Sequence, residues 1–238
     1  MDRSLLRKIE LDPLPRAILV HGSESYWHDV VYTTLQQRNA KDSMAEWNWS
    51  VFEGDKEFEL EPLLNDLGTV AWGQEQKIVV LKKAQLIPAS LMEKVASWLE
   101  EHENANCLAV FINKVDNRLK YTKILRQFAL EIKCDPLEGN RLIRYIQDYC
   151  TEQGKKMTPN CVEDLLNRVG NNLQFIHNEL DKLFAFTEGR EEITVNDVRE
   201  VSALWPGQPA KNTIFQMADF IVQKKRQEAL ELLNLLLS

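Results

Sequence analysis

Two short apolar runs limit what this chain can fold into more than any other feature of its sequence. Residues 77–81 and 107–112 are rich in branched apolar side chains and are bounded by polar or charged residues, which is typical of strands buried on both faces of a sheet. Amphipathic helical patterns follow each run, at residues 91–101 and 119–128. Strands that alternate with helices predict a parallel sheet covered on both sides, so we expect an α/β domain.

The same alternation extends over the first part of the chain and then stops. Further strands are expected at residues 17–21, 47–53 and 131–134, and a further helix at residues 57–66. After residue 135 no strand pattern follows, and helix starts are indicated by Thr158 with its following proline, by Asn171 with Gln174, and by Thr194 with Asp197. The second part of the chain is therefore expected to be all-helical.

The end of the chain carries a strongly apolar helical pair, at residues 213–222 and 226–237. A lone helix pair cannot bury such a stripe. We expect either that the natural protein continues beyond Ser238 or that these helices bind another chain.

Charge and composition narrow the classes of partner. The net charge is −7, which disfavours autonomous binding to DNA phosphates and favours a protein partner. No apolar run is long enough to cross a membrane, and the charged N-terminus lacks a secretory signal. The four cysteines are scattered without a C-x-x-C pair, so we expect reduced thiols in a cytoplasmic protein and no metal site.

Residues 17–35 have the strand, glycine turn and helix of a phosphate-binding loop without its chemistry. In the working pattern G-x-x-x-x-G-K-[ST], backbone amides hold phosphates, the lysine neutralises charge and the hydroxyl binds magnesium. Counted from Gly22, the second glycine, the lysine and the hydroxyl are replaced by Trp27, His28 and Asp29. The sequence predicts a degenerate phosphate loop.

A hydrolysing site also needs an acidic residue at the end of the third strand, to hold magnesium and polarise water. The residues that follow the run at 77–81 are Lys82, Lys83 and Ala84. Because both halves of a nucleotide site are missing, we expect no catalytic residues, no cofactor and no ATP hydrolysis.

Taken in order, these segments resemble the delta subunit of the bacterial DNA polymerase III clamp loader, over nearly all of the chain. The family opens with a strand and a G-x-E-x-[YF] turn, which here reads Gly22-Ser23-Glu24-Ser25-Tyr26. A helix end, a polar bend and an apolar strand match at residues 70–81, and residues 134–137 resemble the junction into a helical domain. The most specific segment is residues 169–183.

The resemblance implies three domains. Residues 1–138 are an AAA+-like α/β domain of the P-loop NTPase type with a degenerate nucleotide site. Residues 139–205 are a helical lid domain, and residues 206–238 begin a helical collar domain that serves oligomerisation.

The resemblance also implies a function without catalysis. A delta subunit binds the ring-shaped sliding clamp (the beta subunit) and holds it open, while ATPase subunits supply the energy. The implied partners are the clamp, the gamma/tau and delta prime subunits, and primer-template DNA only within the assembled complex, with no membrane. The clamp-binding wedge falls on Val70, Ala71 and Trp72, with Trp72 as the main anchor.

The residues themselves also favour Trp72 as a binding residue. Gly68 ends one helix and Gly73 permits a sharp bend, so the residues between them form a short protruding corner. A large aromatic side chain on a corner has few neighbours, which is typical of a binding anchor. The alternative is that Trp72 folds back under the sheet. The tryptophans that we expect in the core are Trp47, Trp49 and Trp98.

Two other functions stay open at this point. An AAA+ ATPase with a divergent phosphate loop predicts binding of ATP with magnesium. An autonomous DNA-binding module predicts salt-sensitive binding of duplex DNA, and the net charge of −7 disfavours it.

Overall fold

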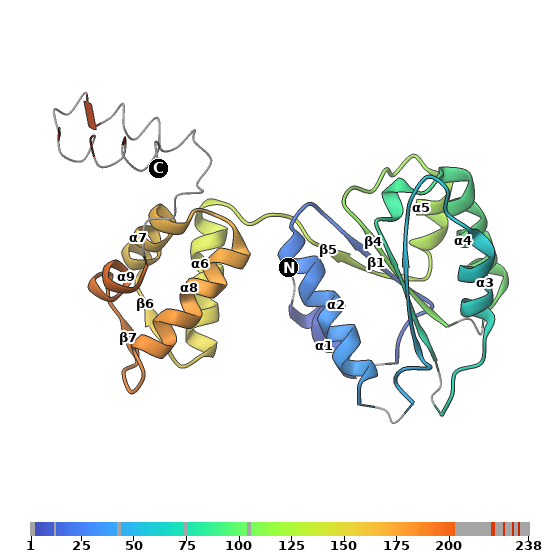
Figure 1. The fold of residues 1–238 in the computed structure, drawn as a ribbon, viewed down its shortest axis with the longest axis horizontal. Coiled ribbons are helices and arrows are strands. Elements are labelled where there is room, and N and C mark those ends of the chain that lie inside the picture. Colours follow the sequence, from blue (N-terminus) through green and yellow to red (C-terminus); the bar gives the residue numbers. More distant parts are fainter. Residues whose placement is uncertain are drawn as a thin grey trace. The chain divides into compact units, whose positions relative to one another are not determined.

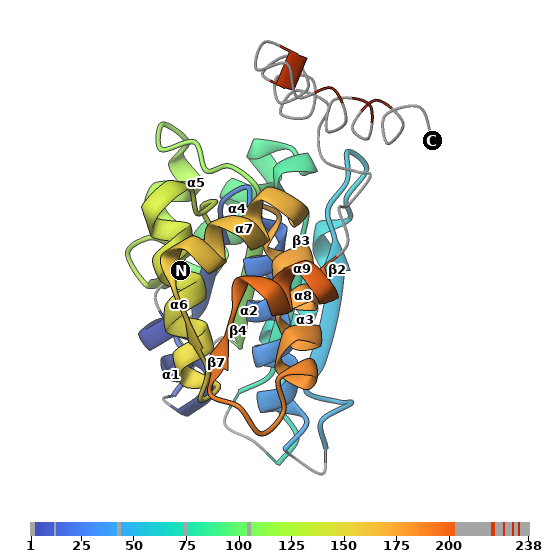
Figure 2. The same cartoon turned by 90° about the vertical axis from the view of Figure 1, so that its left-hand side faces the viewer.

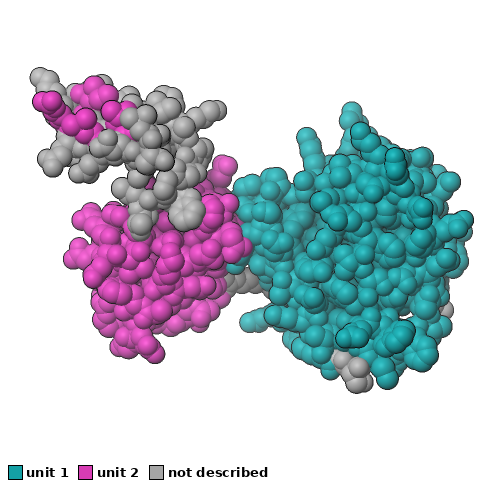
Figure 3. Space-filling model, in the orientation of Figure 1, with its two compact units in different colours: residues 1–136 teal, residues 137–238 magenta. Residues whose placement is uncertain are grey.

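A computed structural model describes residues 3–11, 13–41, 44–73, 76–103 and 106–202, together with Phe220, Ile221, Arg226, Leu230 and Leu233. The chain divides into two compact units, Met1–Pro136 and Leu137–Ser238 (Figure 3). The predicted helical pair and collar segment at residues 206–238 lie outside the described residues, apart from these five positions.

The first unit is built on a five-stranded parallel sheet. The strand order is β2-β3-β4-β1-β5. The strands are β1 (Ala17–His21), β2 (Trp49–Glu53), β3 (Ile78–Lys82), β4 (Cys107–Ile112) and β5 (Ala129–Lys133). The two apolar runs became β3 and β4, and they lie next to each other, buried near the middle of the sheet. This confirms the α/β fold class.

Helices cover both faces of the sheet, as Figure 1 shows, with α1 and α2 on one side and α3, α4 and α5 on the other. Their bounds are α1 (Arg3–Leu11), α2 (Ser25–Asn39), α3 (Leu60–Gly68), α4 (Ala89–Glu101) and α5 (Lys120–Leu125), with a short 3-10 helix η1 (Ala84–Leu86) after β3. The core on the side of α3 to α5 joins alternate strand residues such as Leu19 and Val79 to Leu63, Val95 and Leu125. Helix α1 was not predicted from the sequence.

The second unit consists mainly of helices, seen in Figure 2. These are α6 (Gly139–Glu152), α7 (Pro159–Val169), α8 (Leu173–Phe186) and α9 (Val195–Val201). The prediction of no further strands is wrong in one detail, because β6 (Lys156–Met157) and β7 (Glu192–Ile193) pair in parallel. The side chain of Thr158 caps α7, and Thr194 with Asp197 forms the predicted capping box of α9. The cap of α8 is Asn172 rather than Asn171.

Two further inferences from the sequence concern the cysteines and membrane-spanning helices. All four cysteines are free and buried. Burial raises the thiol pKa of Cys107, Cys134 and Cys150 to about 12 and that of Cys161 to about 11. Within the described residues, no helix is both long and apolar enough to cross a lipid bilayer.

Candidate functional site

The glycine turn after β1 is packed tightly against the end of β5. Gly22 has φ of +136°, and a Cβ added to it would lie 2.8 Å from the Cα of Cys134 and closer still to the Cys134 carbonyl group. Only glycine fits such a backbone approach without movement of the neighbouring chain. The turn therefore has a glycine for reasons of packing against the protein itself.

The backbone amides of this turn are bonded to acceptors of the protein. The amide of Glu24 donates to the carbonyl oxygen of Cys134 at 2.9 Å, and the amide of Gly22 donates to that of Ile112 at 3.4 Å. The carboxylate of Glu24 accepts a hydrogen bond from the amide of Tyr26 at 3.2 Å and caps α2. An acidic side chain thus occupies the helix N-terminus that holds phosphate in a working loop.

The three altered positions of the loop lie in different surroundings. Trp27 is buried and contacts the Tyr26 ring edge-on, with 5.0 Å between centroids. The ring of His28 donates from Nε2 to the carbonyl oxygen of Gly22 at 2.9 Å. Burial lowers the pKa of His28, so the ring is neutral at pH 7 and supplies no lysine-like charge. Asp29 is exposed on α2.

The end of β3 also lacks the acidic residue of an ATPase. The ammonium group of Lys82 lies 3.5 Å from the centroid of the Tyr32 ring. Lys83 adopts a left-handed backbone conformation with φ of 53° and pairs with Glu53. Both lysines are engaged with neighbours on the protein surface, at a position where magnesium chemistry needs a carboxylate.

A crevice of about 410 Å³ lies beside the glycine turn, at the carboxyl ends of β1, β4 and β5. Arg126 donates to Glu131 at 2.6 Å, and the His21 ring lies 2.7 Å from the same carboxylate. Burial works against the charge of Glu131, yet these two bonds outweigh it and hold the pKa of the carboxyl below its usual value. The lining is mostly polar, with three basic side chains against one acidic: His21, Gly22, Ser23, Asn113, Lys114, Val115, Asn117, Arg126, Lys133 and Asp135.

A second feature, at the amino ends of β2 and β3, is a group of exposed apolar side chains. We call it the aromatic corner, and it comprises the exposed Met44, Trp47, Val70 and Trp72 together with the half-buried Ala71. The exposed fractions are 84% for Val70, 61% for Trp72 and 66% for Trp47. The Trp47 and Trp72 rings lie 6.3 Å apart between centroids, tilted by 45°. The alternative in which Trp72 folds under the sheet is not what the structure shows.

The expectation that Trp47 belongs to the core is wrong. The predicted strand started at residue 47, whereas β2 starts at Trp49, so Trp47 lies in the preceding turn and escapes the pleat of the sheet. The other two tryptophans are only partly buried. Trp49 contacts the Tyr32 ring edge-on at 5.5 Å, and Trp98 stacks on His102 at 4.1 Å.

Two buried asparagines hold the segments that carry the corner. The side chain of Asn48 accepts from the backbone amide of Trp72 at 2.8 Å and donates to its carbonyl oxygen at 2.7 Å. The side chain of Asn106 donates to the carbonyl oxygens of Asp66 at 3.1 Å and Thr69 at 2.6 Å, at the end of α3. These residues fix the backbone on both sides of Val70. Sequence reasoning missed both asparagines, although Asn48 stands directly before β2 and Asn106 directly before β4.

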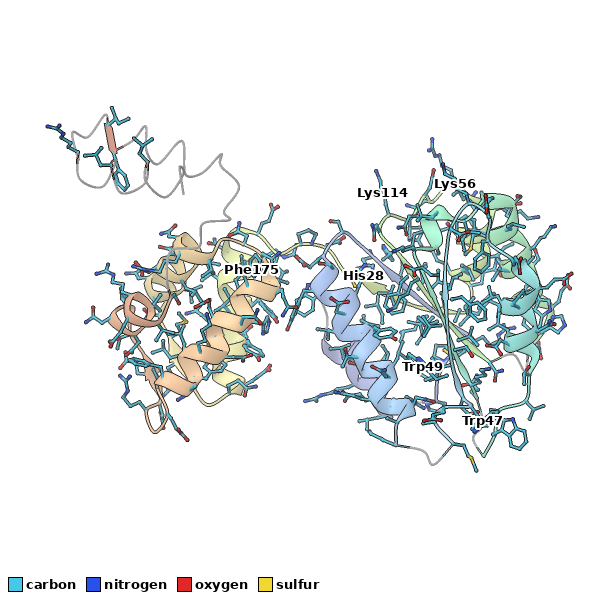
Figure 4. All side chains as sticks on the ribbon, viewed as in Figure 1. His28, Trp47, Trp49, Lys56, Lys114 and Phe175 are labelled. Atoms are coloured by element: carbon cyan, nitrogen blue, oxygen red, sulfur yellow. The ribbon has the colours of Figure 1, made fainter. Side chains whose placement is uncertain are left out.

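The corner and the glycine turn lie at opposite ends of the sheet. Because all strands are parallel, the segments that precede β2 and β3 meet at one edge and the turn after β1 lies at the other. Figure 4 shows Trp47 projecting at one end of the first unit and Lys114, of the crevice, at the other. Gly73 adopts φ of +68°, which gives the sharp bend predicted after Trp72.

Comparisons with known proteins agree on one family. Residues 19–135 match the family model described as DNA polymerase III, delta subunit, and residues 139–200 match a model described as a middle domain. The DNA polymerase III subunit delta of Bacillus subtilis is 25% identical over 237 residues, covering 95% of this chain and 66% of that protein. A probable DNA polymerase III subunit delta of Aquifex aeolicus is 21% identical, covering 95% and 65%.

A solved structure shares the fold. The Bacillus subtilis DNA clamp loader delta protein, YqeN, matches with a TM-score of 0.76 at 22% identity, covering 100% of this chain and 71% of that chain. The chain thus spans about two thirds of the length of the curated relatives it matches.

Proposed function

Since residues 19–135 belong to the DNA polymerase III delta-subunit family, we propose that this chain acts as the delta subunit of a clamp loader. In this proposal it binds the sliding clamp through Val70, Ala71 and Trp72 and opens the ring for loading onto primed DNA. The gamma/tau and delta prime subunits supply the rest of the machine, and ATP is hydrolysed by other subunits. The place of action is the cytoplasm, where bacterial chromosomes are replicated.

The single observation that carries the proposal is the presentation of Trp72. Its indole is 61% exposed while its backbone amide and carbonyl are both bonded to the buried Asn48. A large aromatic side chain presented to solvent from a fixed backbone gains free energy when a partner covers it, roughly 2 kcal/mol for a well-placed anchor. Because the anchor is already fixed, little further ordering is needed on binding.

The geometry of the glycine turn supports the absence of hydrolysis. Two amides of the turn, those of Gly22 and Glu24, are bonded to Ile112 and Cys134, and the Glu24 side chain caps the helix. The neutral His28 adds no positive charge. A triphosphate could bind at the glycine turn only if the turn separated from β5. It would also be repelled by the Glu24 carboxylate at the N-terminus of α2.

The domain assignment is part of the proposal. Residues 139–205 act as a lid and residues 206–238 begin a collar that joins the other loader subunits. Contact with primer-template DNA takes place only in the assembled complex, because the chain carries a net charge of −7.

Binding to the purified cognate clamp tests the proposal. We expect the chain to bind, and Trp72→Ala to bind roughly 30-fold more weakly, which corresponds to about 2 kcal/mol. The matched control is Leu86→Ala, which removes another exposed apolar side chain of the same unit. Equal affinity of Trp72→Ala and the unaltered chain refutes the wedge assignment, and no binding by the unaltered chain refutes the function.

One observation favours the alternative, an AAA+ ATPase with a divergent phosphate loop. The basic crevice of about 410 Å³ adjoins the glycine turn at the end of the sheet where nucleotides bind in such folds. Isothermal titration with ATP and magnesium separates the two functions. Binding at micromolar concentrations establishes the alternative, and the delta-subunit proposal expects none.

A further inference from the structure

We propose that Trp47 is a second anchor for the clamp, so that the docking element is a surface made from two segments far apart in the sequence. This inference rests on the proposed function, since it takes the sliding clamp as the partner. It adds a residue that neither the sequence pattern nor the likeness of residues 70–81 to the family points to.

The first argument is exposure. Trp47 is 66% exposed, slightly more than Trp72, although its indole is among the largest apolar side chains of the chain. Single exposed apolar side chains are common and need no explanation. Here, however, exposed apolar side chains gather in two neighbouring segments, with Val70 two residues before Trp72 and Met44 near Gly73. Such a group of exposed apolar side chains marks a surface that a partner covers.

The second argument is proximity. The two indole rings lie 6.3 Å apart between centroids, within the range of aromatic contacts, and both remain mostly in solvent. A partner pocket that closes over Trp72 therefore also reaches Trp47. Aromatic residues at the centre of an interface contribute most of the binding free energy when their neighbours are covered as well.

The third argument is that one buried residue joins the backbone segments that carry the two rings. Asn48 follows Trp47 directly in the chain, and its side chain holds the backbone of Trp72 through two hydrogen bonds. Its carbonyl oxygen accepts from the amide of Ile78 at 2.9 Å, which ties the pair to the start of β3. The two anchors are thus set relative to each other and to the sheet before any partner binds. Preorganisation of this kind lowers the entropic cost of binding.

The occupant that fits this surface is an apolar groove on the clamp, wide enough to take two neighbouring indoles rather than one. The corner is continuous with the proposed wedge, because Trp72 belongs to both. The methionine at position 44, a flexible and polarisable side chain, can adapt to the edge of such a groove.

The test measures the affinity of the clamp for Trp47→Ala, Trp72→Ala and Leu86→Ala in the whole chain. We expect Trp47→Ala to bind at least tenfold more weakly and Leu86→Ala to bind like the unaltered chain. If Trp72→Ala weakens binding while Trp47→Ala does not, the second anchor is refuted and the proposed function stands. If neither substitution weakens binding, the wedge assignment and the second anchor are both refuted. If the unaltered chain does not bind, the proposed function fails and the inference with it.

A spectroscopic measurement tests the same point without relying on affinity. The chain is labelled with fluorotryptophan, and the signals of positions 47 and 72 are assigned with Trp47→Phe and Trp72→Phe. On addition of the clamp we expect both signals to shift, while that of Trp98, packed on His102, stays unchanged. A shift at position 72 alone refutes the second anchor.

Discussion

Replacement of Gly22 by alanine tests whether the turn after β1 is closed against β5. The new Cβ would lie 2.8 Å from the Cα of Cys134 and nearer to its carbonyl group, where only backbone movement can relieve the overlap. Overpacking of this kind costs about 1–3 kcal/mol, and a positive φ adds about 1–3 kcal/mol for a residue with a side chain. We therefore expect Gly22→Ala to lower the free energy of unfolding by roughly 2–6 kcal/mol.

The matched control is Gly73→Ala in the same unit. Gly73 also has a positive φ, of +68°, but an added Cβ meets only the Cγ of Met44 at an ordinary 3.9 Å. This substitution carries the conformational cost without the overlap, about 1–2 kcal/mol. The difference between the two variants isolates the contact between Gly22 and Cys134.

Urea unfolding followed by tryptophan fluorescence measures this difference. Five of the six tryptophans lie in residues 1–136, so the signal reports mainly on the first unit. We expect Gly22→Ala to be less stable than Gly73→Ala by more than about 1 kcal/mol. Equal destabilisation by the two substitutions contradicts a turn packed on β5 and reopens the phosphate loop as a binding site.

Three other predictions concern protonation, thiol reactivity and the corner. Burial lowers the pKa of His28 below 6.5, so the unfolded chain binds the proton more tightly than the folded chain. The free energy of unfolding should therefore fall as the pH drops below about 6.5. His28→Gln should reduce this pH dependence of stability in thermal melts. Burial raises the pKa of Cys107 and Cys134 to about 12, so iodoacetamide should alkylate them at pH 8 only in denaturant; rapid labelling of the native chain contradicts this. Asn48→Ala leaves the amide and carbonyl of Trp72 without their partner, which costs about 1–3 kcal/mol of stability. We expect this variant to bind the clamp more weakly, with little further loss of affinity when Trp72→Ala is added. An unchanged affinity shows that Asn48 does not position the anchor.

The parts of the fold that depend on local pattern could be predicted from the sequence. The apolar runs of β3 and β4 are continuous because both faces of these strands are covered, and their positions were predicted within a residue. The start of α7 was equally clear, because Thr158 caps it and a proline follows at its first position. Local signals of this kind act over a few residues and need no knowledge of the tertiary structure.

The parts that depend on distant contacts could not be predicted. The partner of Asn48 lies 24 residues away and those of Asn106 lie 29, 37 and 40 residues away, so nothing near either asparagine in the sequence shows what it binds. Trp47 was misplaced because the alternation of large and small residues at 47–53 has the same period whether β2 begins at residue 47 or 49. The sequence therefore predicted Trp72 as an anchor but gave no sign that Trp47 lies beside it.

The glycine turn, which we predict to be a degenerate phosphate loop, lies between these two cases. The loss of the second glycine, the lysine and the hydroxyl was visible at Trp27, His28 and Asp29. The sequence did not show which groups occupy the turn instead. The side chain of Glu24 caps α2, and the amide of the same residue donates to Cys134, which follows β5. Sequence shows which groups are missing from a site, whereas the groups that fill it come from elsewhere in the fold.

Opening of the clamp in the absence of nucleotide tests the central claim most directly. A pair of fluorophores across one subunit interface of the clamp reports the separation of its two sides. On addition of this chain alone, without ATP, we expect the separation to increase, and added ATP with magnesium to leave the result unchanged. A ring that stays closed, or that opens only when ATP is present, contradicts a subunit that opens the clamp by binding alone.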